Sequence, residues 1–397
     1  MATRFNILSG QRPGDSGTGR LVTHVRQEIA RYAPSFSLVT RPDPPVAVPT
    51  LVRRRRWGQA LQVFIGHAGR ELWFRLGLRA VRRRVREPLL VLHPQTLGFR
   101  NFLELVDGRI LPATLFLLDS SFFCIASYNH LLGENRPCMR CVGGDFKQAR
   151  RHECEPFPKP DPTAHEYVIR ILDLVKQGRI RIVAQNARQA ELAQRHFGLS
   201  EPPAVVGLWT KDWDPLLETA RTKQPVAMPE QTQIVFHGFD LDAKGAAWLE
   251  KVAEHIPRRR FIFPFPRPAK RTPPRNCEYK PMTWETGLED AVSSAQCVVV
   301  PSLWSAPIEG SLVKSIVLSR RVAVTENDSS YVDELPDGLV LRLHADPAKA
   351  GPALDRALNQ GWKPDPNVKA VWLAKLSLQR HEFLERLLSA VYGGMEA

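Results

Sequence analysis

Residues 297–327 read CVVVPSLWSAPIEGSLVKSIVLSRRVAVTEN and predict a strand, a loop, a helix and a second strand. The apolar run Cys297–Val300 predicts a buried strand that stops at the following proline. A loop rich in Ser, Trp, Pro and Gly leads into a helix from about Gly310, and Val322–Thr325 predicts the next strand. Strand, helix and strand in so short a stretch form a βαβ unit with a parallel sheet. Its loop lies where phosphates gather, because free backbone N–H groups and the helix dipole point there.

Two more loops of this kind are predicted elsewhere in the chain. Near the start, an apolar strand at Phe5–Ser9 runs into GQRPGDSGTGR, in which glycines on either side of Thr18 let a ligand approach the backbone. Such glycine-rich turns also open many α/β domains that bind nothing there. In the second half, QIVFHGFDLDAKGAAW predicts a strand at Ile234–His237, a loop from Gly238, and Lys244 just before a helix.

The composition limits the class of protein. At 397 residues the chain is too long for one core and fits two domains. No apolar run reaches the roughly 18–20 residues that cross a bilayer, and the start MATRFNILSG lacks the apolar segment of a signal peptide. We therefore expect a cytoplasmic protein whose six cysteines form no disulfides. A formal net charge of +14 favours anionic partners such as nucleotides, phospholipid headgroups, lipid diphosphates or nucleic acid.

The segment from Leu51 to Arg86 alternates arginine clusters with aromatic and aliphatic residues. The clusters are Arg53–Arg56 and Arg82–Arg86. A basic helix that also carries aromatic side chains can lie on an anionic membrane surface, which would place the protein on the inner face of the cell membrane. The alternative is a helix whose apolar stripe packs in the domain core while the arginines face water.

The segment FFCIASYNHLLGENRPCMRCVGGDFKQARRHECEPFP, residues 122–158, has the cysteine spacing of a metal site. Cys138 and Cys141 form a CxxC pair, and Cys154 follows after twelve residues. We expect a structural zinc ion here; an iron–sulfur cluster or reduced thiols without metal are the alternatives. The fourth ligand is Cys124, which would complete an all-thiolate set, or else His130 or His152.

Residues 301–324, PSLWSAPIEGSLVKSIVLSRRVAV, resemble the donor-site motif of the retaining GT-B glycosyltransferases with an E-x7-E motif (family 4-like). Their loop reads PS-x-x-E-G-F-G and continues as E-A-M-A-x-G-x-P-V. The two glutamates of that motif fall here on Ala306 and Lys314, and Glu309 stands where a glycine is usual. Lys244 matches the family lysine that reaches the donor diphosphate, whereas Phe239 replaces the family arginine.

The resemblance follows the whole chain in element order and implies two Rossmann-like parallel-sheet domains that face a cleft. Residues 1–208 would bind the acceptor and carry a cysteine-rich insertion at 120–160. A linker at 209–230 would lead to the donor domain at 231–365, and the terminal helix at 366–397 would pack back on the first domain. The implied activity is transfer of a sugar from a nucleotide-sugar donor to an envelope glycan, a lipid-linked acceptor or another hydroxyl acceptor.

Glycosyl transfer makes the donor diphosphate a leaving group, so the site must stabilise growing negative charge. Helix N-termini and lysines can do this without a catalytic metal. Glu309 acts on the sugar or only stabilises the helix N-terminus, and Lys314 is a second cation or a solvated surface residue. Asp119, at the end of a strand and near His93, is the other catalytic candidate. The predicted donor-binding residues are Gly17, Thr18, Gly19, Gly238, Lys244, Ser302, Gly310, Ser311 and Lys314.

Two other classes of protein fit parts of the sequence. Loss of both family glutamates favours a non-catalytic protein that binds nucleotide sugars or glycans on the same scaffold. The net charge and the CxxC pair favour a nucleic-acid-binding protein with a zinc knuckle. Aromatic residues do not interleave with the basic residues near that pair, so we expect no nucleic-acid partner.

Overall fold

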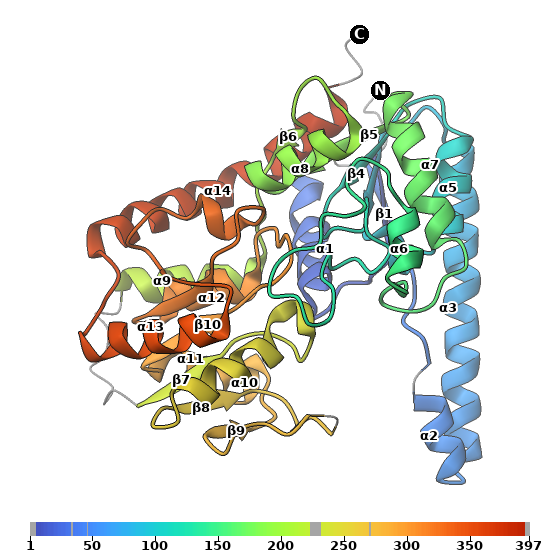
Figure 1. Cartoon of the computed structure of the whole chain (residues 1–397). Helices are drawn as coiled ribbons and strands as arrows, with labels where there is room; N and C mark the ends of the chain where they lie inside the picture. Colours follow the sequence, from blue (N-terminus) through green and yellow to red (C-terminus); the bar gives the residue numbers. More distant parts are fainter. Residues whose placement is uncertain (1–4, 33–34, 46, 223–231, 270, 394–397) are drawn as a thin grey trace.

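The computed structural model describes residues 5–32, 35–45, 47–222, 232–269 and 271–393 (Figure 1). Within these residues the chain forms two six-stranded sheets, one from each half of the sequence. Every strand pair in both sheets is parallel. The predicted α/β architecture of two parallel sheets is confirmed.

The first sheet has the strand order β2-β1-β3-β4-β5-β6. Its strands are β1 (Phe5–Ser9), β2 (Phe36–Thr40), β3 (Leu89–Leu92), β4 (Ala113–Phe116), β5 (Ile180–Ala184) and β6 (Ala204–Val205). The helices of this half are α1 (Gly17–Glu28), η1 (Ile29–Arg31), α2 (Ala47–Arg53), α3 (Trp57–Arg83), α4 (Pro94–Leu97), α5 (Phe99–Asp107), α6 (Lys147–Arg151), α7 (Ala164–Lys176) and α8 (Ala187–Phe197).

The second sheet has the order β12-β11-β10-β7-β8-β9. Its strands are β7 (Gln233–Phe236), β8 (Arg260–Phe263), β9 (Cys277–Tyr279), β10 (Cys297–Val300), β11 (Val322–Thr325) and β12 (Leu341–Leu343). The helices of this half are η3 (Asp242–Lys244), α10 (Ala246–His255), η4 (Trp284–Thr286), α11 (Leu288–Ser294), α12 (Gly310–Leu318), η5 (Tyr331–Glu334) and α13 (Pro347–Asn359). The predicted βαβ unit is β10-α12-β11, with Val298 beside Val322.

Several interior strands are buried at every position, as expected of parallel strands covered by helices on both faces. This holds for β3, β4, β10 and β11, which carry the continuous apolar runs of the sequence. The edge strands β2 and β9 are only half-buried.

Part of the expected linker is folded. Residues 211–222 form η2 (Lys211–Trp213) and α9 (Asp214–Thr222), which follow one another without a break. Trp209 and Trp213 are 0% and 2% exposed and stack edge to face, with ring centroids 5.3 Å apart. This segment is therefore anchored by two buried indole rings. The rest of the expected linker, residues 223–230, lies outside the described residues.

The last helix, α14 (Pro366–Tyr392), contacts both halves of the chain (Figure 1, red). Near its start, Lys369 Nζ donates to the Ser319 carbonyl at 3.1 Å, at the end of α12. Near its end, Arg181 of β5 donates to the Ala390 carbonyl at 2.8 Å. Apolar side chains of α14 and of both sheets form one continuous core cluster.

We expect Leu387→Ala to lower the free energy of unfolding by about 2–5 kcal/mol, because it leaves a cavity in this shared cluster. Leu387 is fully buried, whereas Leu378 on the same helix is 57% exposed. Leu378→Ala is the matched control and should change stability by less than about 0.5 kcal/mol. Urea unfolding followed by circular dichroism measures both. Equal effects would contradict the placement of α14.

Candidate functional site

The loop between β10 and α12 contains a small polar network around Glu309. The Glu309 carboxylate accepts hydrogen bonds from Lys244 Nζ and from Ser302 Oγ. Glu309 is 7% exposed and Ser302 is 2% exposed, so the network is shielded from water. Lys244 comes from η3, the turn between β7 and α10, and so two loops at the carboxyl ends of neighbouring strands meet here. The structure thus brings three predicted site residues together.

Glu309 is also the N-cap residue of α12. Among the described residues, its side chain makes no hydrogen bond to the N–H groups of the helix. The first turn, which contains Gly310 and Ser311, therefore keeps N–H groups that the cap does not use. Gly310 faces Trp213, since a Cβ at this glycine would lie 3.9 Å from the indole ring. The start of α12 is thus a partly covered anion-binding position.

Lys314 lies one turn into α12 and is buried, at 4% exposure. The alternative of a solvated surface lysine is wrong. Its Nζ lies 2.7 Å from Asp212 Oδ2 and 4.2 Å from the centroid of the Trp284 ring. Burial lowers the pKa of Lys314, and the hydrogen bond and charge of Asp212 oppose this shift. The lysine is kept in place by one carboxylate and one aromatic face.

The predicted glycine loop of the first half is followed by a residue that contacts the same Asp212 carboxylate. Gly17, Thr18 and Gly19 form the first turn of α1, where the Ser16 side chain accepts from the Gly19 N–H at 3.0 Å. The next residue, Arg20, places Nη1 2.7 Å from Asp212 Oδ2. Asp212 therefore bridges the start of α1 and the start of α12.

Asp212 was not predicted as a site residue because it lies in the expected linker. Burial raises its pKa, but the hydrogen bond and charge of Lys314 and the charge of Arg20 outweigh burial, and the net shift is downward. It therefore stays ionised at neutral pH. The pair of basic residues that converges on it, one from each half of the sequence, is visible only in three dimensions.

The cysteine-rich segment contacts the β10–α12 loop through two adjacent residues. Asn129 Nδ2 donates to Ser305 Oγ at 2.9 Å, and the Ser305 N–H donates to Asn129 Oδ1 at 3.0 Å. Tyr128 packs edge to face on Trp304, with ring centroids 4.6 Å apart. Lys244 Nζ lies 4.8 Å from the Trp304 ring centroid and 5.4 Å from that of Tyr128. Sequence analysis missed these residues, although all lie in the two stretches that it singled out.

Trp304 carries an unused hydrogen-bond donor at this junction. It is 3% exposed, and its Nε1 has no partner among the described residues. Buried indole N–H groups usually find an acceptor. The Trp304 N–H thus lacks the acceptor that a buried indole usually has.

Asp119 lies on the first-half side, just beyond β4. It accepts from Gln95 Nε2 and from the Ser121 N–H at 2.9 Å, and His93 Nε2 lies 3.7 Å from its Oδ2. His93 has φ of 56°, a left-handed conformation that is strained for a residue other than glycine. Burial lowers the pKa of His93 and so favours the neutral imidazole.

Tyr128 brings a half-buried phenol to this junction. Burial raises the pKa of its phenol, Lys244 opposes that shift, and Asp119 and Glu309 add to it. The charges of Asp119, Glu309 and Lys244 thus all influence the pKa of Tyr128. His237, which follows β7, shares a hydrogen bond of 2.8 Å with Ser315 Oγ, and burial lowers its pKa to about 3. It is a neutral packing residue at physiological pH.

Gly238 follows β7, and its backbone lies close to an aromatic ring. A Cβ there would come within 2.9 Å of Phe236 and 3.7 Å of the Lys244 side chain. A glycine is therefore required for packing beside Lys244.

The four cysteines of residues 122–158 line one small cavity together with His130 and His152. None of them is in a disulfide within the described residues. As the side chains stand, no group of three or more His, Cys, Asp or Glu residues in the described ranges is arranged to hold a metal ion. The zinc ion therefore stays a prediction, supported by four thiols around one cavity.

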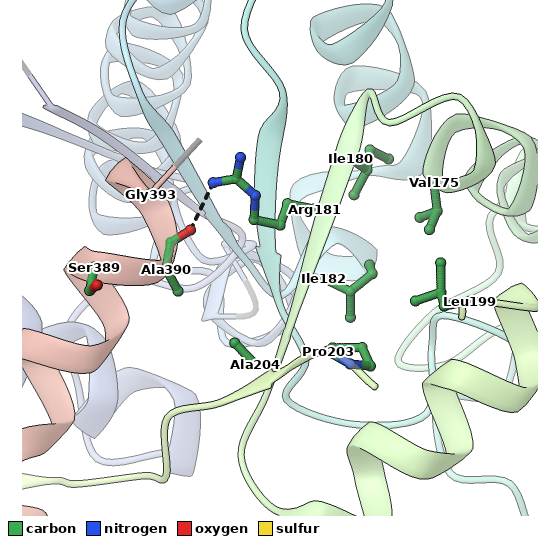
Figure 2. Close-up of a pocket in the computed structure, with 10 residues that line it drawn as sticks. All are labelled: Val175, Ile180, Arg181, Ile182, Leu199, Pro203, Ala204, Ser389, Ala390 and Gly393. Carbon is green, nitrogen blue, oxygen red and sulfur yellow. Dashed lines mark hydrogen bonds between the residues drawn. The ribbon is translucent and has the colours of Figure 1, made fainter. Parts of the chain in front are cut away.

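A cavity of about 410 Å³ lies away from all of these residues (Figure 2). It is lined mainly by apolar side chains of β5, β6 and the end of α14, and it includes Arg181. The cavity meets β5 at its amino end, beginning with Ile180. Ligands of open α/β sheets bind at the carboxyl ends of the strands, so we assign no site here.

Comparisons with known proteins bear on the fold. No family model and no curated protein matches the sequence. Among solved structures the chain is similar to sucrose-phosphate synthase from Thermosynechococcus elongatus, at 13% identity and a TM-score of 0.58, over 98% of this chain and 100% of that one. It is also similar to HepE from Anabaena in complex with UDP-glucose, at 10% identity and a TM-score of 0.54, with the same coverage. At these identities the likeness shows the fold alone, which is the GT-B fold expected from the sequence.

The ion pair between Lys244 and Glu309 gives a test of the site. Lys244→Met leaves a buried carboxylate without its cation and should lower stability by about 3–5 kcal/mol. Adding Glu309→Gln removes that charge and should recover much of the loss. A double-mutant cycle by urea unfolding measures the coupling. Purely additive effects of the two substitutions would contradict a direct pair.

Proposed function

We propose that this protein is a glycosyltransferase that moves a sugar from a nucleotide-sugar donor to a hydroxyl acceptor. The observation that carries the proposal is a pair of lysines near the start of α12: half-buried Lys244 binds the N-cap residue Glu309, and buried Lys314 lies one turn into the helix. Cations beside a helix N-terminus form an anion site, and a donor diphosphate carries the matching charge. The shared fold with HepE, whose structure contains UDP-glucose, supports the choice of donor.

The chemistry follows from charge development. During transfer the bond between the anomeric carbon and the diphosphate oxygen breaks, and a bond to the acceptor oxygen forms while the acceptor loses its proton. The diphosphate leaves with the electron pair, so its negative charge grows in the transition state. Lys244, Lys314 and the N–H groups of Gly310 and Ser311 would stabilise that charge without a divalent ion. Glu309 and Asp212 would neutralise the lysines before the donor binds.

The site departs from the E-x7-E group in a way that changes what it can bind. In that group a glutamate one turn into the helix holds the ribose, as an acceptor of hydrogen bonds from its hydroxyl groups. Lys314 stands at this position and can only donate. We propose that it contacts phosphate instead, and that the protein is a divergent, family 4-like member of the GT-B enzymes. Asp119 stays the candidate that takes the acceptor proton, and Glu309 the candidate that acts on the donor sugar.

A second candidate function is binding of a nucleotide sugar without transfer. Ala306 and Lys314 stand in place of the two family glutamates, which favours binding without transfer. Lys244 and Lys314 are also each paired with an acid of the same chain. The two functions predict the same ligand and differ only in turnover. Measurements of binding and of product formation on one sample therefore separate them.

We expect UDP-, GDP-, dTDP- or CMP-linked sugars to raise the melting temperature in a thermal-shift panel. Lys244→Ala should weaken diphosphate binding by about tenfold or more, because a charge-assisted contact is worth about 1.5–3 kcal/mol. Lys251→Ala, on the exposed face of α10, is the matched control. Release of nucleoside diphosphate, with and without sugar acceptors, then reports turnover. Binding without any release would select the second candidate, and unchanged affinity in Lys244→Ala would remove the lysine from the site.

We also propose that the cysteine cavity holds a structural zinc ion whose role is to fix the segment that contacts the β10–α12 loop. The Cys138 N–H donates to the Asn129 carbonyl at 2.6 Å, and Asn129 Nδ2 donates to the Cys138 carbonyl at 3.1 Å. Asn129 in turn bonds Ser305. A metal that restrains Cys138 would thereby restrain the β10–α12 loop.

Elemental analysis of the purified protein should find about one zinc per chain, since four cysteines can complete a tetrahedral site. Cys138→Ser with Cys141→Ser should release the metal and lower the melting temperature. Cys277→Ser is the control, because this cysteine lies on β9 in the other half of the chain. A wild-type preparation without zinc or iron would end the proposal, and iron with inorganic sulfide would identify the cluster instead.

A further inference from the structure

Helix α3 (Trp57–Arg83) has two apolar faces, and only one of them is covered. The covered face includes Ala60, Phe74, Leu78 and Val81, each at most 5% exposed. The other face exposes large apolar side chains, some of them by more than half of their surface. These are Trp57 (63%), Leu61 (59%), Phe64 (55%), Ile65 (60%), Leu72 (58%), Trp73 (75%) and Leu76 (42%).

The exposed residues form a continuous stripe because their spacing follows the helix period. Trp57, Leu61, Phe64, Ile65, Leu72 and Leu76 recur at intervals of three, four or seven to eight residues, which places them on one side of the helix. Trp73 lies at the margin of that side. At about 1.5 Å per residue the stripe is nearly 30 Å long. Singly exposed apolar residues are ordinary, but a contiguous patch of this size marks an interaction surface.

The position of α3 leaves this face open over much of its length. Figure 1 shows α2 and the adjoining part of α3 extending beyond the first sheet. In the first half of α3, most side chains are exposed and the main packing partner is α2. The second half packs on β2 and α5 through the covered face. The uncovered face of α3 is therefore accessible to a binding partner.

Arginines flank the apolar stripe at both ends. Arg53, Arg54, Arg55 and Arg56 precede it and are exposed. Arg75, Arg79, Arg83 and Arg86 are exposed towards its other end. Glu71 is the acidic residue within α3, and its Oε1 lies 3.4 Å from Arg75 Nε. The surface therefore combines an apolar band with basic ends and little opposing charge.

We propose that this surface of α2 and α3 docks on a phospholipid bilayer that contains anionic headgroups. An interfacial helix inserts its apolar band at the boundary of headgroups and acyl chains, and basic residues at its margins contact the lipid phosphates. The arginines supply the complementary charge, and the two tryptophans suit the interface. No helix within the described residues is long and apolar enough to span a bilayer. The contact is thus along the surface.

The occupant is a bilayer rather than a second copy of the chain because of the charge distribution. Two copies packed stripe to stripe would bring their arginine clusters near one another, and like charges at an interface are unfavourable. A bilayer with acidic headgroups offers an apolar interior and negative charge together. If the proposed glycosyl transfer is correct, the acceptor would be a lipid-linked or membrane-bound glycan presented on the same surface.

Cosedimentation with vesicles tests the docking without any donor sugar. Wild-type protein should bind vesicles in which phosphatidylglycerol replaces part of the phosphatidylcholine, and should bind pure phosphatidylcholine much less. The triple variant Leu61→Gln, Phe64→Gln, Ile65→Gln should lose at least tenfold in affinity. Replacing Arg53–Arg56 with Gln should weaken the preference for anionic vesicles and its dependence on salt, because the arginines at the other end of the stripe remain.

A matched control carries the same number of exposed apolar-to-Gln changes elsewhere. Ile169→Gln, Val371→Gln and Leu378→Gln alter α7 and α14, where these residues are 48%, 57% and 57% exposed. This variant should bind vesicles like the wild type. Circular dichroism and melting temperature confirm that each variant is folded.

Fluorescence gives a second readout. Vesicles with brominated acyl chains should quench tryptophan emission, and Trp57→Phe with Trp73→Phe should remove most of that quenching. Absence of wild-type binding to anionic vesicles, or unchanged binding of the apolar triple variant, would overturn the proposal. So would a dimer, seen by light scattering, that the triple variant dissociates while vesicles fail to bind. The donor thermal shift is measured without vesicles, so either proposal can fail while the other stands.

Discussion

The site depends on keeping positive charge buried at the start of α12. A lysine that is removed from water loses several kcal/mol of solvation free energy, and a nearby anion offsets this loss. The helix N-terminus adds a further partial positive charge. Lys314 therefore needs Asp212, and Lys244 needs Glu309. These internal ion pairs mark the position that we propose for the donor diphosphate.

The interior of both sheets could be predicted from the sequence, and the edges could not. Strands such as β3, β10 and β11 lie between helices on both faces, so each is a continuous apolar run. No comparable run of apolar residues marks β2, β6, β9 and β12, which are the four edge strands of the two sheets. They are short or only partly buried, so neither an apolar run nor strict alternation marks them.

The candidate site was predictable where it follows from local topology. Gly310, Glu309 and Lys244 lie in turns after parallel strands, and the carboxyl ends of such strands meet at one edge of a sheet. Asn129 and Asp212 could not be found in this way. Asn129 contacts a residue 176 positions away, and Asp212 joins α1 to α12 from a segment expected to be a linker. These contacts depend on how the two halves face each other, which no local pattern encodes.

The two halves of the chain contact each other through apolar packing and through polar contacts. These two kinds of contact differ in how much free energy is needed to open them. Along α14 and η2 the contacts include a large apolar part, with Trp213 and Phe383 at most 2% exposed, beside polar contacts such as the ion pairs of Asp212. Elsewhere they are hydrogen bonds and ion pairs, such as Asn129 with Ser305, and Asn186 and Arg188 with the acids of η5. Each such polar contact adds only about 0.5–1.5 kcal/mol, because water can replace either partner. Opening at the polar side while the apolar side stays packed is the least costly rearrangement. It would separate Asn129 from Ser305 and so free the β10–α12 loop from the cysteine-rich segment.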